Sequence, residues 1–254
     1  MVSQLTQSPL QIANPEQLER IRHTSAHVMA MAVQILFPET KVTIGPTTDT
    51  GFYYDFDRAA PRQGRDRPQP FTPEDLKKIT KQMRFIIKAN LPIIREEVTR
   101  EEIKGEIERL NESYKLEILD SIPEGETITR YYIGSPDGGR LPDVGEKLKA
   151  ALPEPSLIKP IKIPATVSGW DLCAGPHINY TGESNPDAFA LESVAGAYWR
   201  GDETKAQLLR IYGTAWESPE LLVAYLQQKE EAKRRDHRKL GIVLKLFSIQ
   251  EDAG

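Results

Sequence analysis

The stretch Asn14-Pro-Glu-Gln-Leu-Glu-Arg-Ile-Arg-His-Thr-Ser-Ala-His27 carries the clearest local folding signals in this sequence. Asn14 is a preferred helix cap, Pro15 suits a first helical turn, and Gln17 follows three residues after the cap. Apolar residues then recur at helical spacing as far as Leu36, where a Phe-Pro step follows. We therefore predict one long helix that ends at Leu36.

A histidine pair lies within this predicted helix, and a cysteine–histidine pair lies much later in the chain. His23 and His27 are four positions apart and share one helix face. Cys173 and His177 have the same spacing, but the Gly-Pro step between them predicts a turn. Together the four groups can hold zinc or activate water, whereas separately they can equally be packed histidines and a small buried thiol.

Composition limits the classes of protein to which this chain can belong. Its 254 residues are 39% apolar and 28% charged, which is typical of a globular protein with one large or two small domains. A net charge of −4 means that a nucleic-acid partner would need local basic patches. A single cysteine excludes an intrachain disulfide and fits a reducing cytoplasm. Residues 1–13 resemble no signal peptide and are predicted to be a disordered leader, and no apolar run is long enough to cross a membrane.

Local patterns also predict the elements that follow the first helix. Capping signals, β-prone runs and turn residues predict a β-hairpin over 41–57, a polar loop over 58–70, a helix over 72–89, a strand over 91–97, a helix over 99–110 and a strand over 115–119.

The second half of the chain combines an apparent insertion with a terminal helix. Residues 134–164 are rich in Gly and Pro and read as an inserted loop. The segments 191–199 and 208–216 are apolar and aromatic and flank a charged turn. A last helix begins at Ser218 and is polar on every face over 227–239, which indicates either a connector to a further domain or a helix packed along its own domain.

Seven segments, in matching order and approximate spacing from about residue 17 to the end, resemble the N-terminal half of threonyl-tRNA synthetases. They are His23–His27 (HTSAH), Ile44-Gly-Pro with Gly51–Phe56 (GFYYDF), Tyr114–Glu117 (YKLE), Asp171–His177 (DLCAGPH), Val194–Asp202 (VAGAYWRGD), Arg210–Trp216 (RIYGTAW) and Arg235–Gly241 (RDHRKLG).

This resemblance implies an α+β editing domain, with helices packed on antiparallel sheet, of the type shared with alanyl-tRNA synthetases and free-standing deacylases. The implied editing domain covers 14–217, with the insertion at about 134–164, and 218–254 would be a long connector helix leading to an aminoacylation core. The implied activity is hydrolysis of serine wrongly esterified to tRNA(Thr) in the cytoplasm. The ligase's ATP site and the core through which it would form a homodimer are expected to lie outside this chain, as is its small ubiquitin-like domain.

The resemblance also implies roles for individual residues. His23 and Lys115 would be the principal catalytic pair, with His23 acting on water or the terminal ribose and Lys115 on the oxyanion or water. The other pocket residues are expected to be His27, Cys173 and His177. Without the resemblance, Lys115 would be interpreted as a surface lysine.

The remaining implied residues would bind the substrate. Asp171 is expected to bind the substrate's ammonium group or to orient water, and Tyr54 to contact the terminal adenosine. The candidates for contacts with tRNA phosphates are Arg200, Lys205, Arg210, Lys233, Arg234, Arg235, Arg238 and Lys239. The run from Lys233 onward can equally be a solvated helix face.

The expected partner is therefore tRNA(Thr) carrying serine, with no DNA and no membrane involved. No cofactor is required by this interpretation. Related free-standing deacylases bind zinc through this type of residue set, so zinc at His23, His27, Cys173 and His177 remains an alternative. Two other functions remain open: a non-catalytic tRNA-binding or structural fragment with a pocket blocked by the insertion, and a metal-dependent hydrolase unrelated to tRNA.

Overall fold

The structure is a computed structural model that describes residues 12–58, 69–134 and 170–235. The predicted leader up to residue 11, the insertion from residue 135, and the connector beyond residue 235 lie outside the described residues. Nothing in the structure therefore tests those three predictions.

The first helix, α1, spans Pro15–Leu36 as predicted, and the Asn14 side chain caps it by accepting from the amide of Gln17 at 3.1 Å. Almost every side chain from Ile21 to Gln34 is buried. A helix that is buried on most of its faces must lie inside the domain and not on its surface. The helix α1 is thus the central element on which the site is built.

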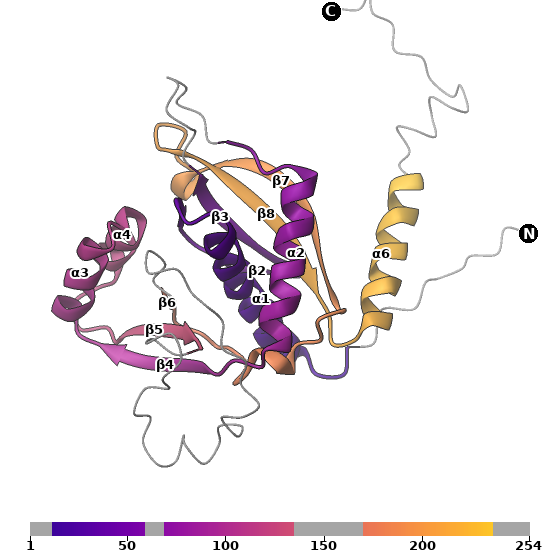
Figure 1. Cartoon of the computed structure of the whole chain (residues 1–254), viewed down its shortest axis with the longest axis horizontal. Coiled ribbons are helices and arrows are strands. Elements are labelled where there is room, and N and C mark those ends of the chain that lie inside the picture. Colours follow the sequence, from indigo (N-terminus) through magenta and orange to yellow (C-terminus); the bar gives the residue numbers. More distant parts are fainter. Residues whose placement is uncertain (1–11, 59–68, 135–169, 236–254) are drawn as a thin grey trace, which may run out of the picture.

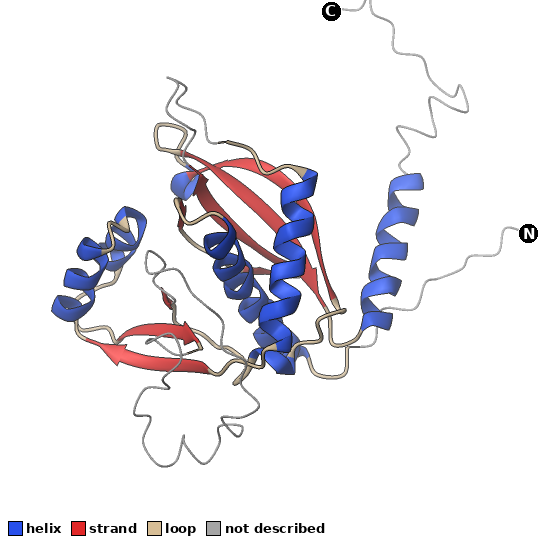
Figure 2. Ribbon diagram, viewed as in Figure 1, coloured by secondary structure: helices blue, strands red, loops and turns tan. Residues whose placement is uncertain are grey.

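A five-stranded antiparallel sheet packs against α1 and α2 (Pro73–Lys88) (Figures 1 and 2). Its main strand order is β1-β3-β8-β7, and β2 pairs with β3. The predicted hairpin and second helix are confirmed. The strands are β1 (Thr40–Val42), β2 (Thr47–Thr48), β3 (Gly51–Arg58), β7 (Phe189–Tyr198) and β8 (Gln207–Ala215).

A smaller antiparallel sheet, in the order β4-β5-β6, forms a second core with α3 and α4. The buried apolar residues of this core include Ile94, Ile103 and Ile107. The strand at β4 and the helix at α3 are confirmed, whereas β5 was not predicted. The elements are β4 (Ile93–Val98), α3 (Arg100–Arg109), α4 (Ser113–Ser121), β5 (Ile128–Ile133) and β6 (Trp170–Leu172).

The predicted strand over 115–119 is wrong, because this segment lies within α4. Tyr114 and Ile118 pack in a cluster with side chains of the large sheet, whereas Leu119 lies in the small-sheet core. Lys115 is four positions before Leu119 and is buried on that same side. Two buried stripes at i,i+4 spacing require a helix, since a strand would send alternate residues to opposite faces.

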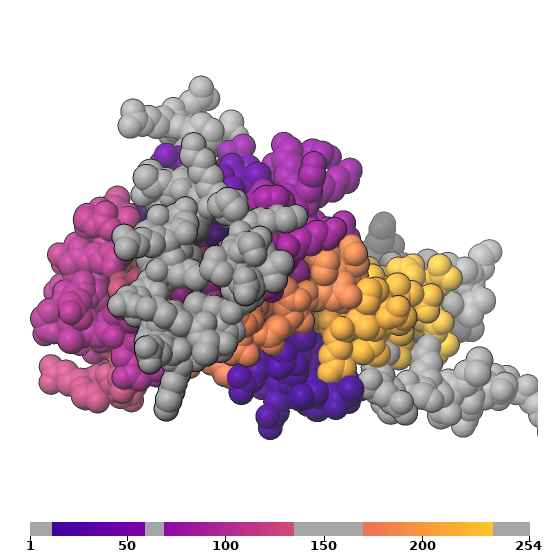
Figure 3. All heavy atoms as spheres, turned by 60° about the horizontal axis from the view of Figure 1, so that its bottom comes forward, coloured from indigo at the N-terminus to yellow at the C-terminus, as the bar shows by residue number. Residues whose placement is uncertain are grey.

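The last described helix, α6, spans Pro219–Arg234, and Ser218 is its N-cap, so the helix starts where the sequence predicts. Its Leu222 packs with Leu18 and Trp216, so its first turns lie on its own domain. The small-sheet layer and α6 lie at opposite ends of the molecule (Figures 1 and 3). Two short 3-10 helices, η2 (Thr181–Glu183) and η3 (Trp199–Gly201), complete the described elements. Within the described ranges, no helix combines the length and apolar character needed to cross a bilayer.

Truncating a side chain in the small-sheet core should destabilise the protein, whereas truncating an exposed side chain on α6 should not. Ile103 has no exposed area, so Ile103→Ala is expected to cost about 2–5 kcal/mol of unfolding free energy through lost burial and a cavity. Val223 is 52% exposed on α6, and Val223→Ala should change stability by less than about 0.5 kcal/mol. Urea unfolding of both variants checks this, and equal effects would contradict the assigned core.

Candidate functional site

The two histidine/cysteine pairs meet where α1 faces the irregular segment that follows β6. One nitrogen from each of the three histidines and the sulfur of Cys173 all lie within 4.8 Å of one another. The Cys173 sulfur is 3.3 Å from Nε2 of His23 and 3.3 Å from Nε2 of His177. The helix face and the turn predicted from the sequence therefore bring His23, His27, Cys173 and His177 together.

Backbone groups fix the orientation of this cluster. His23 Nδ1 donates to the carbonyl oxygen of Pro176 at 3.1 Å, which leaves the lone pair of its Nε2 pointing toward Cys173. The amide of Gly175 donates to the Cys173 sulfur at 3.2 Å. His177 Nδ1 lies 3.2 Å from the hydroxyl of Thr24, one residue along α1 from His23. The residues next to the two pairs thus fix the orientation of the His23 and His177 rings and of the Cys173 thiol.

Burial keeps the cluster electrically neutral. Desolvation, together with the adjacent His23 and Lys115, lowers the pKa of His27 to about 3. The pKa of His23 and that of His177 are also lowered, chiefly by burial. Burial raises the pKa of Cys173 to about 12. At neutral pH the site therefore presents unprotonated imidazoles, which can accept a proton or bind a metal ion.

The donor set fits a zinc ion. A tetrahedral site with Zn–N and Zn–S bonds of about 2.0–2.3 Å places its ligand atoms roughly 3.3–3.8 Å apart. The two sulfur–nitrogen separations of 3.3 Å already match this spacing. His23, His27, Cys173 and His177 would hold the ion. A tetrahedral ion held by all four has no position left for water, so it would polarise a water molecule only if one of the four ligands were replaced by that water.

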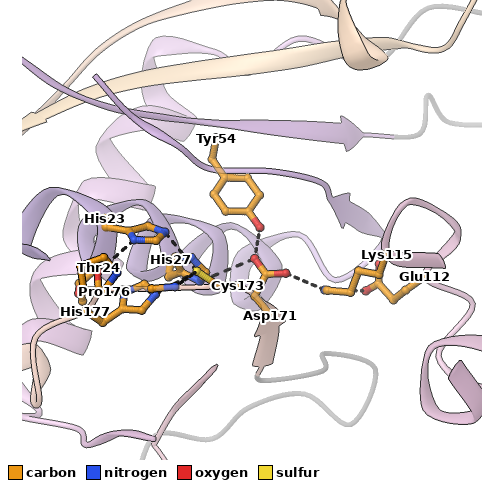
Figure 4. Close-up of polar contacts among 11 residues, drawn as sticks. His23, Thr24, His27, Tyr54, Glu112, Lys115, Asp171, Cys173, Pro176 and His177 are labelled. Atoms are coloured by element: carbon orange, nitrogen blue, oxygen red, sulfur yellow. Dashed lines mark hydrogen bonds and ion pairs between the residues drawn. The ribbon is translucent and has the colours of Figure 1, made fainter. Parts of the chain in front are cut away.

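A second group of polar side chains adjoins the cluster and is charged (Figure 4). Asp171 Oδ2 lies 3.7 Å from His27 Nδ1 and accepts a hydrogen bond from the hydroxyl of Tyr54. Asp171 Oδ1 lies 3.8 Å from the ammonium nitrogen of Lys115. On the far side of that ammonium, Glu112 Oε1 lies 3.9 Å away. His27, Asp171, Lys115 and Glu112 thus form one line of interacting groups.

Lys115 and Tyr54 both have 0% exposure. The interpretation of Lys115 as a surface lysine is therefore wrong, because the turn of α4 points it toward Asp171 and the ring of Trp170. The hydroxyl of Tyr54 is used by Asp171, and no surface of Tyr54 is open to a nucleoside in this conformation. Its position is that of a residue which orients Asp171.

A pocket of about 320 Å³ opens beside the cluster. His23, Asp171, Cys173 and the loop 43–46 are among the residues that line it. A much smaller cavity of about 30 Å³ lies behind His27 and Asp171, which is room for about one water molecule. The larger pocket is the only one of the two that can admit part of a substrate.

The basic residues expected to bind phosphate do not line this pocket. Arg210 forms two hydrogen bonds, at 2.7 and 2.8 Å, to the buried carboxylate of Asp55. Lys205 is 3.7 Å from the carboxylate of Glu117, and Arg200 donates to the Glu117 carbonyl at 2.9 Å. Each is thus engaged by a group of the domain. Of the last run, Arg234 and Arg235 form i,i+4 ion pairs with Glu230 and Glu231, and Arg238 and Lys239 lie outside the described residues.

Sequence reasoning missed one member of the charged group, Glu112. It lies three positions before Lys115, a spacing that brings two side chains together only on a helix. Because 115–119 was predicted as a strand, that pairing was not visible. A helix prediction for this segment would have found Glu112.

No family model matches the chain. It is 49% identical over 245 residues to a threonine–tRNA ligase of Gloeobacter violaceus, a match that covers 96% of this chain and 32% of that protein. A threonine–tRNA ligase of Synechocystis is 52% identical over 252 residues, covering 97% of this chain and 35% of the ligase. A chloroplastic/mitochondrial threonine–tRNA ligase of Arabidopsis thaliana is 54% identical over 239 residues, covering 94% and 30%.

This chain belongs to the threonine–tRNA ligase family. The resemblance carried by the seven motifs is thereby confirmed. The chain spans about a third of the length of these relatives, so the comparison assigns the ligase family and not a particular activity to the segment.

The wall of the pocket depends on a glycine. A Cβ atom at Gly45 would lie 2.1 Å from the ring of Tyr54. Gly45→Ala should therefore displace Tyr54 from Asp171 and cost about 1–3 kcal/mol of unfolding free energy. Gly105 provides a matched control, because a Cβ at this position of α3 would meet nothing within 4 Å. Gly105→Ala should therefore raise the unfolding free energy by about 0.5–1 kcal/mol. Thermal unfolding measures both, and a neutral Gly45→Ala would contradict the close contact.

Proposed function

We propose that this chain is the editing part of a threonine–tRNA ligase, which hydrolyses the ester of seryl-tRNA(Thr). The observation that carries the proposal is the neutral histidine cluster next to a buried lysine–carboxylate group. His23, His27 and Cys173 of the cluster and Asp171 of the charged group line one pocket. Ester hydrolysis needs a proton acceptor for water and groups that balance charge on the substrate. The two adjoining groups supply these two requirements separately. Membership of the ligase family supplies the expected substrate.

Such a hydrolase would correct the weak discrimination between threonine and serine in the ligase reaction. Serine and threonine differ by one methyl group, which distinguishes them by only about 1–3 kcal/mol in a binding pocket. A site that accepts threonine cannot strongly reject the smaller serine. A second pocket that accepts serine and excludes threonine multiplies the discrimination.

The geometry gives each residue a proposed role. His23 Nε2, whose lone pair is left free of the Pro176 contact, takes a proton from water as the water attacks the ester carbonyl. The bond from that carbonyl carbon to the ribose oxygen then breaks, and the ribose oxygen takes the proton back. Asp171 binds the ammonium group of the amino acid, and Lys115, which has no surface on the pocket, contributes its positive charge to the reacting ester from behind Asp171.

The proposed setting follows from the same family assignment. The partner is tRNA(Thr) carrying serine, in the cytoplasm, with no role for DNA or a membrane. Arg200 and Lys205 are exposed and make one polar contact each among the described residues, so they keep N–H donors for phosphate, whereas Arg210 has two of its donors on Asp55.

The catalytic roles predict large losses of rate. His23→Ala and Lys115→Ala should each lower kcat/KM for seryl-tRNA(Thr) by at least about 10²-fold, the usual scale for losing an acid–base or oxyanion group. Lys104→Ala, an exposed lysine on the neighbouring α3, is the control and should leave the rate unchanged. Deacylation of seryl- and threonyl-tRNA(Thr) by the purified chain measures this. A wild-type chain that binds tRNA without hydrolysing seryl-tRNA(Thr) would instead support the non-catalytic alternative.

The proposed mechanism requires no metal, although the cluster fits zinc. We expect deacylation to survive dialysis against a chelator, with zinc in the dialysed protein measured by elemental mass spectrometry. His23 would then act as a base through the same nitrogen that a metal would occupy. Loss of activity on dialysis, followed by recovery on adding Zn²⁺, would contradict the metal-free mechanism and assign the water-activating role to the ion.

A further inference from the structure

Glu112 occupies an unusual position for an acidic side chain. It precedes α4 at the N-cap position, yet its side chain makes no capping hydrogen bond. The residue is only 6% exposed, and its Oε2 atom has no hydrogen-bond partner among the described residues. A carboxylate is almost never buried without a compensating partner, because desolvation is costly. Its burial therefore needs an explanation other than the start of the helix.

The partner of Glu112 is the ammonium group of Lys115. That ammonium lies between Glu112 at 3.9 Å and Asp171 at 3.8 Å, and both separations exceed a hydrogen-bond distance (Figure 4). Among the described residues, neither Lys115 Nζ nor Asp171 Oδ1 has a hydrogen-bond partner. The ammonium is thus shared between the two carboxylates and is not committed to either.

The charges of this group do not cancel. One ammonium faces two carboxyl groups, those of Glu112 and Asp171, and cannot neutralise both. Burial raises the pKa of each carboxyl group, and the charge of Lys115 opposes that rise. Lys41 is the other cation near Glu112, but it is partly exposed and hydrogen-bonds to Ser113, so solvent screens it. If Glu112 balances Lys115, the negative charge of Asp171 remains available. Asp171 also lines the larger pocket, whereas Glu112 does not.

We propose that Glu112 is a positioning residue that holds Lys115 back from Asp171, so that Asp171 can bind the α-ammonium group of an aminoacyl ester. This inference rests on the proposed function and names the feature of the substrate that the site selects. The preferred substrates are aminoacyl esters with a free, protonated amino group. An N-acylated ester has no such charge and gains nothing from Asp171.

The inference predicts a specific effect of Glu112→Gln. Without the second carboxylate, Lys115 pairs with Asp171, and KM for seryl-tRNA(Thr) should rise by about tenfold or more, the scale of a lost hydrogen bond to a charged group, while kcat changes little. Hydrolysis of N-acetylseryl-tRNA(Thr) should be equally slow in the wild-type chain and the variant. In an Asp171→Asn background, Glu112→Gln should have no further effect on KM.

A second variant separates positioning from structural damage. Asp120 is an exposed carboxylate on the same helix, α4, so Asp120→Asn should leave the preference for a free amino group unchanged. Urea unfolding of each variant reports whether α4 remains folded. An equal loss on both substrates, or an unchanged KM in a folded Glu112→Gln, would overturn this inference alone. An inactive wild-type chain would overturn the proposed function and this inference with it.

Discussion

The ammonium group of Lys115 is buried with no exposed surface, and the carboxylates of Glu112 and Asp171 beside it compensate its charge. An uncompensated charge in a protein interior costs several kcal/mol, so its partners must be fixed in place. One partner, Asp171, comes from β6 of the small sheet, and Tyr54 from the large sheet binds the same carboxylate. The two sheets must therefore keep a defined separation for the charge to be tolerated.

The helix α4 fixes the position of Lys115 between the two sheets, because contacts hold it on both faces. Tyr114 donates to Asp57 at 2.8 Å, and Glu117 accepts from the indole of Trp199 at 2.7 Å, which ties α4 to the large-sheet side. Leu119 packs into the small-sheet core from the opposite face. Displacement of either sheet would therefore move Lys115 relative to Asp171. The fold and the site are stabilised by the same contacts.

Much of the fold followed from local signals, and the failures occurred where contacts are long-range. The helices α1, α2 and α3 have caps and periodic apolar residues that act within a few positions, and such signals are visible in a sequence. The helix α4 is short and has no side-chain cap, so its stability comes from packing on both sheets. Because the sequence does not predict α4, it does not predict the burial of Lys115 or the position of Glu112 beside it either. The histidine/cysteine cluster was visible because its rare residues occur in two spaced pairs.

The site divides into a neutral part and a charged part, and this division is a condition for both to work. If His27 were protonated, its charge would oppose that of Lys115, and burial without a firm partner would be costly. Kept neutral, the imidazoles retain their lone pairs for a proton or a metal ion. Asp171, 3.7 Å from His27, is the point where the two parts meet. Its carboxylate can therefore hold a cationic group next to neutral imidazoles, which is the arrangement that the proposed hydrolysis uses.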